Sequence, residues 1–206
     1  MRLRRIVMAT VATLLLLSAV GAWTVLRRPA LASTGGINPA DFTNPVPNPY
    51  FPLKVGTVSR YLGGDGPQKL REQVTVTHWT KKIQGVTTTV IFDVLHRADD
   101  GSLAEKTWDW YADDNAGNAW YFGERTATYT RSGHVSSREG TWQAGVNGAV
   151  AGTIMPANPR PTDAYRQEFY AGHAEDQAWI VQRTARVRSE ERRVGKECRS
   201  RWSPYH

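Results

Sequence analysis

The stretch that decides the fold is VTTTVIFDVLH, residues 86–96. Apolar and β-branched side chains recur along it with a period of two, which is typical of a β-strand. Val86 and Val90 fall on one face of this strand, and Ile91 and Leu95 fall on the other. Because both faces are partly apolar, a sheet covered on one side only would leave part of the strand unburied. The stretch therefore predicts a sheet that curls into a barrel or half-barrel, or is covered on its second face.

Similar short segments occur on both sides of this stretch, separated by polar clusters such as TKKIQG, ADDG and DDNAGN. These clusters have the composition and length of hairpin connections. The expected strands cover residues 57–62, 70–79, 86–96, 103–111, 119–124, 127–130 and 165–170, with one more running from residue 178 towards 187. The glycine and proline content of residues 140–163 predicts a long ordered loop. We thus expect an all-β antiparallel meander, truncated at its C-terminal end.

The N-terminus has the pattern of an export signal. Three arginines precede an apolar run at residues 6–26, and Ala30-Leu31-Ala32 resembles a cleavage site. The run is also long enough to cross a bilayer, so residues 1–32 are either a cleaved signal peptide or an N-terminal membrane anchor. Residues 33–52 contain five prolines and are expected to form an extended linker. The protein is expected to be secreted or held at the cell surface.

The last nineteen residues, 188–206, differ in character from the rest. Their codons can be written so that they reproduce a common short-read sequencing adapter without a mismatch. We interpret them as a non-native, artefactual tail, which leaves residues 53–187 as an incomplete β-rich domain. The alternative is a basic solvated tail.

The net charge of +7 comes from the two ends of the chain. Five of the 26 basic residues lie in residues 1–32 with no acidic residue, and six lie in 188–206 with three acidic residues, so residues 33–187 carry 15 basic and 16 acidic residues. A near-neutral domain lacks the basic stripe that nucleic-acid binding requires. The only cysteine, Cys198, lies in the tail, so neither a disulfide framework nor a thiolate metal site is expected.

Aromatic residues give the leading functional hypothesis, a non-enzymatic domain that binds an apolar or sugar-like ligand or a cell-envelope component. Trp108 and Trp110 share one face of a strand, and Trp120 and Phe122 share one face of the next. Such rings pair across strands, either as core or as the wall of a ligand site in a curled sheet. Polar contacts are expected from the block YRQEF, and the predicted ligand-binding residues are Trp108, Trp110, Trp120, Phe122, Arg166 and Glu168.

Acidic residues give two alternatives. Paired carboxylates hydrolyse glycosides when they face each other across a cleft, and Asp109, Glu124, Glu139 and Glu168 are the available acids. The cluster of Asp109, Asp113, Asp114 and Asn118 offers oxygen ligands for calcium, although the spacing is not that of an EF-hand, and turn hydrogen bonding explains the same residues. We assign no catalytic residue and expect no cofactor, with calcium as the one alternative.

Three blocks carry a resemblance to known proteins. NPYFPLKVGTVSRY at 48–61, WDWYADDNAGNAWYFGE at 108–124 and IMPANPRPTDAYRQEFYAGHAED at 154–176 together resemble an uncharacterised family of secreted bacterial β-rich proteins. The resemblance spans residues 48–187. It implies an exported β-domain whose chain continues with further strands, and it implies no activity.

Overall fold

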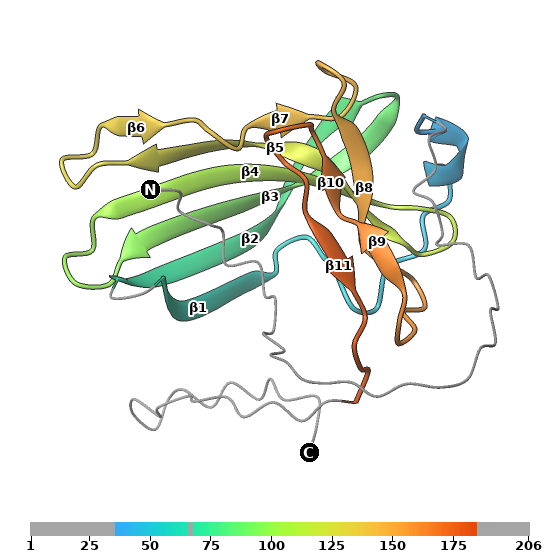
Figure 1. Cartoon of the computed structure of the whole chain (residues 1–206), viewed down its shortest axis with the longest axis horizontal. Coiled ribbons are helices and arrows are strands. Elements are labelled where there is room, and N and C mark those ends of the chain that lie inside the picture. The colour runs from blue at the N-terminus through green and yellow to red at the C-terminus, as the bar shows by residue number, and fades with distance from the viewer. Residues whose placement is uncertain (1–35, 66–67, 185–206) are drawn as a thin grey trace, which may run out of the picture.

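The computed structural model describes residues 36–65 and 68–184, so the predicted signal or anchor and the predicted artefactual tail lie outside the described residues. The main sheet has the strand order β1-β2-β3-β4-β5-β8-β10, with β6 and β7 also paired to β5 (Figure 1). Its strands are β1 (Val58–Asp65), β2 (Gln68–Ile83), β3 (Val86–Arg97), β4 (Leu103–Asp113), β5 (Ala119–Tyr129), β6 (Val135–Ser137), β7 (Trp142–Gln143), β8 (Val150–Met155) and β10 (Glu168–Phe169). A second sheet pairs β9 (Ala164–Arg166) with β11 (Gln177–Trp179).

The first five strands form an antiparallel meander, in which each strand pairs with the next along the chain. The β2–β3 hairpin turns on Gln84 and Gly85, which have φ angles of 47° and 84°. Positive φ at both turn residues matches the right-handed twist of the strands. The sheet curls through 207°, slightly more than half a turn, which confirms the predicted all-β half-barrel.

An irregularity in β2 bends the sheet near its middle. Val76 pairs with Ile91 and Thr80 pairs with Thr89, so three residues of β2 stand opposite Val90 alone. The Thr77 hydroxyl donates to the Val90 carbonyl over 2.7 Å and accepts the backbone N–H of Trp79 over 3.1 Å. Extra residues of this kind increase local bending and redirect side chains.

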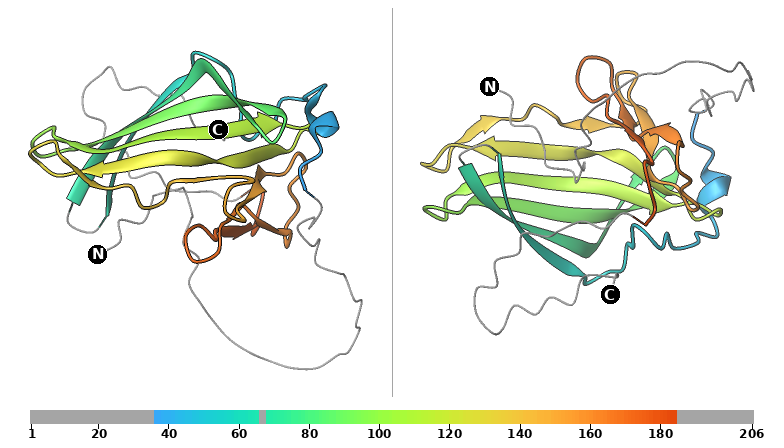
Figure 2. Two further views of the ribbon diagram at one scale, coloured as in Figure 1. Left: turned by 90° about the horizontal axis from the view of Figure 1, so that it is seen from above. Right: turned by 60° about the horizontal axis from the view of Figure 1, so that its bottom comes forward.

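The C-terminal strands lie together at one end of the main sheet and on one side of it (Figures 1 and 2). At Gly152 in β8, a Cβ atom would lie 2.5 Å from the backbone of Gln167. No side chain fits at such a distance, so glycine is required where β8 meets this segment.

The core fills the end of the half-barrel that the 3-10 helix η1 (Pro39–Phe42) covers. Its buried residues include Ile83, Val86, Val90, Trp110, Ala112, Tyr121, Phe122 and Trp142. Phe42 meets the Phe122 ring edge-on, with 5.6 Å between the ring centroids. Asn48, only 1% exposed, donates its side-chain amide to the carbonyls of Gly117 and Met155. The described part of the predicted linker 33–52, residues 36–52, therefore includes a helical turn and packs on the domain.

Several predicted boundaries change. The predicted loop at 140–163 contains β7, β8 and a turn whose Gly145 and Gly148 have positive φ. Glycine here serves the turn and, at Gly152, a close approach of backbone to a strand, so its abundance does not indicate a loop. The predicted break TKKIQG lies mostly inside β2, and the predicted strands 119–124 and 127–130 are one strand. The predicted strand 165–170 is divided between β9 and β10. No helix in the described residues has both the length and the apolarity to cross a bilayer.

Candidate ligand-binding site

Strand β4 directs aromatic and acidic side chains to opposite faces of the sheet. Trp108 and Trp110 point to one face, which we call the aromatic face, while Asp109 between them points to the other, the acidic face. On β3, Phe92 stands opposite Trp108 and Val90 stands opposite Trp110. A ligand held by the tryptophans would therefore lie on the far side of the sheet from Asp109.

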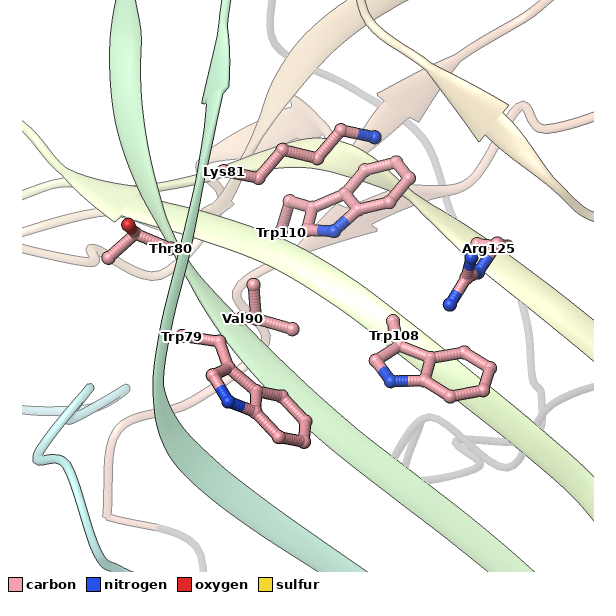
Figure 3. Close-up of a pocket in the computed structure, with 7 residues that line it drawn as sticks. All are labelled: Trp79, Thr80, Lys81, Val90, Trp108, Trp110 and Arg125. Carbon is pink, nitrogen blue, oxygen red and sulfur yellow. The ribbon is translucent and has the colours of Figure 1, made fainter.

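The aromatic face contains a hollow of about 380 Å³. It is lined by Trp79, Thr80, Lys81, Val90, Trp108, Trp110 and Arg125 (Figure 3). Its volume falls at the lower end of the range for small-molecule pockets, about 300 to 1,000 Å³. The size suits a small ligand or a short segment of a longer one.

Trp79 is the most accessible aromatic wall of this hollow, with half of its surface exposed (50%). It lies in the irregular part of β2, where its backbone N–H is bound by the Thr77 hydroxyl. Trp110 is only 6% exposed and belongs to the core cluster. The Trp108 ring packs against Phe92, with centroids 5.1 Å apart. Trp79 is therefore the ring with most surface to offer a ligand.

Two cationic side chains lie over the other two indoles. The Nζ of Lys81 is 3.3 Å from the centroid of a Trp110 ring, and the guanidinium carbon of Arg125 is 4.3 Å from that of Trp108 (Figure 3). A cation at such a distance is attracted by the ring quadrupole. Burial lowers the pKa of Lys81, and the nearby charge of Arg125 lowers it further. Within the described ranges, the only ion pairs are those of Arg131, so neither cation is neutralised by a carboxylate there.

Arg125 reaches Trp108 because of a shift in register. Asp113, Ala112 and Tyr111 pair with Ala119, Trp120 and Tyr121, as a regular hairpin requires, but Asp109 then pairs with Glu124. The extra residue lies near Gly123, whose φ of 121° is outside the range of most side chains. Without this extra residue, Glu124 and not Arg125 would stand opposite Trp108.

The structure brings two of the six predicted ligand-binding residues, Trp108 and Trp110, into the hollow. Phe122 is fully buried, and Trp120 packs against Phe42 with its indole N–H bound to Asp114. The two polar candidates lie in the C-terminal segment. Arg166 lies over the Phe169 ring at 4.4 Å, and Glu168 accepts a 2.9 Å hydrogen bond from the indole of Trp142.

The acidic face holds two of the four predicted acids. Asp109 is 7% exposed, Glu124 is 2% exposed, and they are direct partners on β4 and β5. The Tyr121 hydroxyl lies 2.8 Å from Asp109 Oδ1 and 2.7 Å from Glu124 Oε2. A hydroxyl has one hydrogen, so it can donate to one of these oxygens at a time. Of the other predicted acids, Glu139 is exposed near the β6–β7 connection.

Three more acids extend this row across the sheet, namely Glu72, Asp93 and Glu105. Burial raises the pKa of Asp93 to about 9, and the neighbouring charges of Glu72, Asp109 and Glu105 and a hydrogen bond with Glu72 add to the increase. Burial also raises the pKa of Glu72. Glu105 accepts from the hydroxyls of Thr107 and Thr126, at 3.1 and 3.4 Å. Asp93 is therefore protonated at neutral pH.

The predicted calcium ligands are divided between two places. Asp114 accepts two backbone N–H groups of its turn, the side-chain amide of Asn118 and the indole N–H of Trp120. Asn118 also accepts the backbone N–H of Ala157. Asp113 ends β4, and burial raises its pKa to about 6. Asp109 lies away from this turn, on the acidic face, where it contacts the Tyr121 hydroxyl. Over the described part of the chain, no three His, Cys, Asp or Glu side chains are grouped to hold a metal ion.

The prediction from sequence missed Trp79, Lys81 and Arg125 as lining residues. Trp79 and Lys81 flank the end of a predicted strand, and Arg125 fell between two predicted strands. No protein-family model, no curated protein and no solved structure matches the chain. The resemblance to a secreted bacterial family therefore stays a prediction, and the role of the hollow is inferred from its own residues.

Proposed function

We propose that the chain is an exported, non-enzymatic domain that binds a small ligand or a component of the cell envelope in the hollow of its aromatic face. The sequence pattern of residues 1–32 supports export, by secretion or by attachment to the cell surface. Trp79, Trp108 and Trp110 supply apolar surface, and Lys81 and Arg125 supply polar contacts. Pockets that bind small molecules combine apolar walls with a few polar groups in this way.

The observation that carries the proposal is the half-exposed indole of Trp79 at the edge of the hollow. Leaving a large ring in water forgoes the free energy that its burial would release. A ligand that covers the ring recovers this energy. The flanking cations and the hollow give such a ligand a defined position.

Calorimetric titration of the full chain with neutral oligosaccharides, acidic oligosaccharides, cell-wall fragments and lipid vesicles tests the proposal. We expect one of these classes to bind, and the Trp79→Ala variant to bind it at least tenfold more weakly. Trp179→Ala is the matched control, because Trp179 is 65% exposed on β11 and does not line the hollow. Equal weakening by both variants, or no binding of any class, would overturn the proposal.

A paired-carboxylate hydrolase is the second candidate, and one contact favours it. Asp109 Oδ1 and Glu124 Oε2 contact the same hydroxyl, at 2.8 and 2.7 Å. The distance between these two oxygens therefore cannot exceed the sum of the two contacts. Close carboxylates are also a feature of glycosidases that retain anomeric configuration, whose two carboxyl groups lie about 5 to 5.5 Å apart. Release of reducing ends from a panel of polysaccharides, abolished by Glu124→Gln and unaffected by Glu139→Gln, would support it. No release from any polysaccharide would exclude glycoside hydrolysis on that panel.

A further inference from the structure

We infer that the ligand of the aromatic hollow is an acidic saccharide, with its anionic group between Lys81 and Arg125 and a sugar ring against Trp79. This inference rests on the proposed function and names the class of ligand. Three observations support it: the charge of the hollow, the ring faces that remain uncovered, and the volume of the hollow.

The charge of the hollow is positive and unbalanced. Lys81 and Arg125 both line it, and within residues 36–65 and 68–184 neither side chain forms an ion pair. Their charges repel each other closely enough to lower the pKa of Lys81, in addition to the effect of burial. An anion between them would replace this repulsion with two attractive interactions. A neutral ligand would leave the repulsion in place.

The cations are also held in position before any ligand arrives. Each lies over an indole, Lys81 over Trp110 and Arg125 over Trp108. A side chain that is already oriented loses less entropy when it binds an anion. The tryptophans of β4 therefore act as supports for the cations, and their covered faces are not the surfaces on which a ligand stacks.

The apolar part of the ligand is left with Trp79 as its main partner. The Trp79 ring is half exposed and lies at the same hollow as the two cations. A pyranose presents a face of C–H groups that can cover an indole, and it carries hydroxyl groups that remain in water at an open site. With a volume of about 380 Å³, the hollow accepts a short segment of a glycan. Carboxylated sugars combine these features in one ligand.

Calorimetry of the full chain with galacturonate oligosaccharides and with galactose oligosaccharides of equal length tests the inference, since the two differ at the carboxylate. We expect the acidic series to bind at least tenfold more tightly, and the difference to shrink at high salt. Lys81→Gln and Arg125→Gln should each weaken the acidic series about tenfold. Lys81→Arg, which keeps the charge, should stay within about threefold of the unmodified chain.

Lys82→Gln is the matched control for charge. Lys82 is the next residue of β2, is exposed, and does not line the hollow, so the same loss of charge there should change affinity less than twofold. Thermal melting of each variant checks that the domain is folded.

The outcomes separate the two proposals. Equal binding of neutral and acidic oligosaccharides, weakened by Trp79→Ala, would overturn the inference and leave the proposed function intact. Binding only to vesicles that contain phosphatidylglycerol would also overturn it, because the anion would then belong to a lipid. Binding of inorganic phosphate at millimolar concentration, without binding of galacturonate, would show a bare anion site and would overturn the saccharide inference. Absence of binding to every probe would defeat both proposals.

Discussion

The hydroxyl of Thr77 donates a 2.7 Å hydrogen bond to the backbone carbonyl of Val90 on the neighbouring strand. At this point β2 carries three residues opposite one, so Val90 would otherwise lack a regular cross-strand donor. The same hydroxyl accepts the N–H of Trp79. One buried side chain thus closes the irregular part of the ladder and fixes the backbone that presents Trp79 to the hollow.

Replacing Thr77 with valine, which has nearly the same shape, should destabilise the domain by about 1 to 3 kcal/mol, because a buried carbonyl and an N–H lose their partner. The measurement is the free energy of unfolding in urea. Thr75→Val is the control, since Thr75 lies two residues earlier on the same strand and its hydroxyl bonds to no described residue. If the two variants unfold at the same urea concentration, Thr77 does not hold the irregularity in place.

Gly123→Ala should lower the free energy of unfolding of the domain by about 3 kcal/mol or more. At this position φ is 121° and a Cβ would lie 2.4 Å from the carbonyl oxygen of Trp142. The change therefore combines backbone strain with a backbone clash. Gly101→Ala is the matched control, with φ at 72° and no atom within 4 Å of the added Cβ, and should cost only about 1 kcal/mol. Thermal melting of both variants is the measurement, and equal melting temperatures would contradict the close approach of Gly123 to the Trp142 backbone.

The curl of the sheet could be predicted because its cause is local to a strand. Two-faced apolar alternation in residues 86–96 requires cover on both faces wherever the strand lies, and in β3 Val90 and Ile91, on opposite faces, are each only 6% exposed. Trp108 and Trp110 could be assigned to one face for the same reason. Both predictions use only the alternation of side chains along a single strand, which does not depend on how that strand pairs with its neighbours.

The cationic half of the hollow depends on register and could not be predicted in this way. Lys81 belongs to TKKIQG, whose polarity indicates a turn, but the curl of the sheet extends β2 through it to Ile83. Arg125 faces Trp108 only because of the extra residue near Gly123. The expected pairing of Trp108 and Trp110 with Trp120 and Phe122 assumed a regular hairpin. A single inserted residue moves every later partner by one position.

Stability should depend on pH through Asp93. Its pKa is about 9 in the folded chain, against about 3.9 in an unfolded one, so the folded state keeps a proton that the unfolded state loses. The stabilisation is fully present below pH 4 and is lost as the pH rises towards 9. We expect the free energy of unfolding to fall by up to about 1.4 kcal/mol for each pH unit in this interval, before other groups contribute.

Asp93→Asn isolates this effect, because asparagine resembles the protonated acid at every pH. Relative to the unmodified chain, the variant should gain stability steadily between pH 5 and pH 9, measured by urea unfolding at pH 5, 7 and 9. Asp176→Asn, at an exposed position, should run parallel to the unmodified chain. A constant difference between Asp93→Asn and the unmodified chain would mean that Asp93 is already ionised at pH 5.

The packing of residues 36–52 makes a prediction that distinguishes an integral part of the domain from a linker. Phe42 meets the rings of Phe122 and Trp120 edge-on, at 5.6 and 6.1 Å, and Phe122 is fully buried beneath it. Removing the Phe42 ring uncovers this part of the core, so Phe42→Ala should cost about 2 to 3 kcal/mol, less than a fully buried phenylalanine because Phe42 is half-buried. Val46→Ala, at a side chain that is 50% exposed, should change stability by less than about 0.5 kcal/mol. A linker would tolerate both changes equally. Equal urea midpoints for the two variants would therefore show that this segment does not contribute to the stability of the domain.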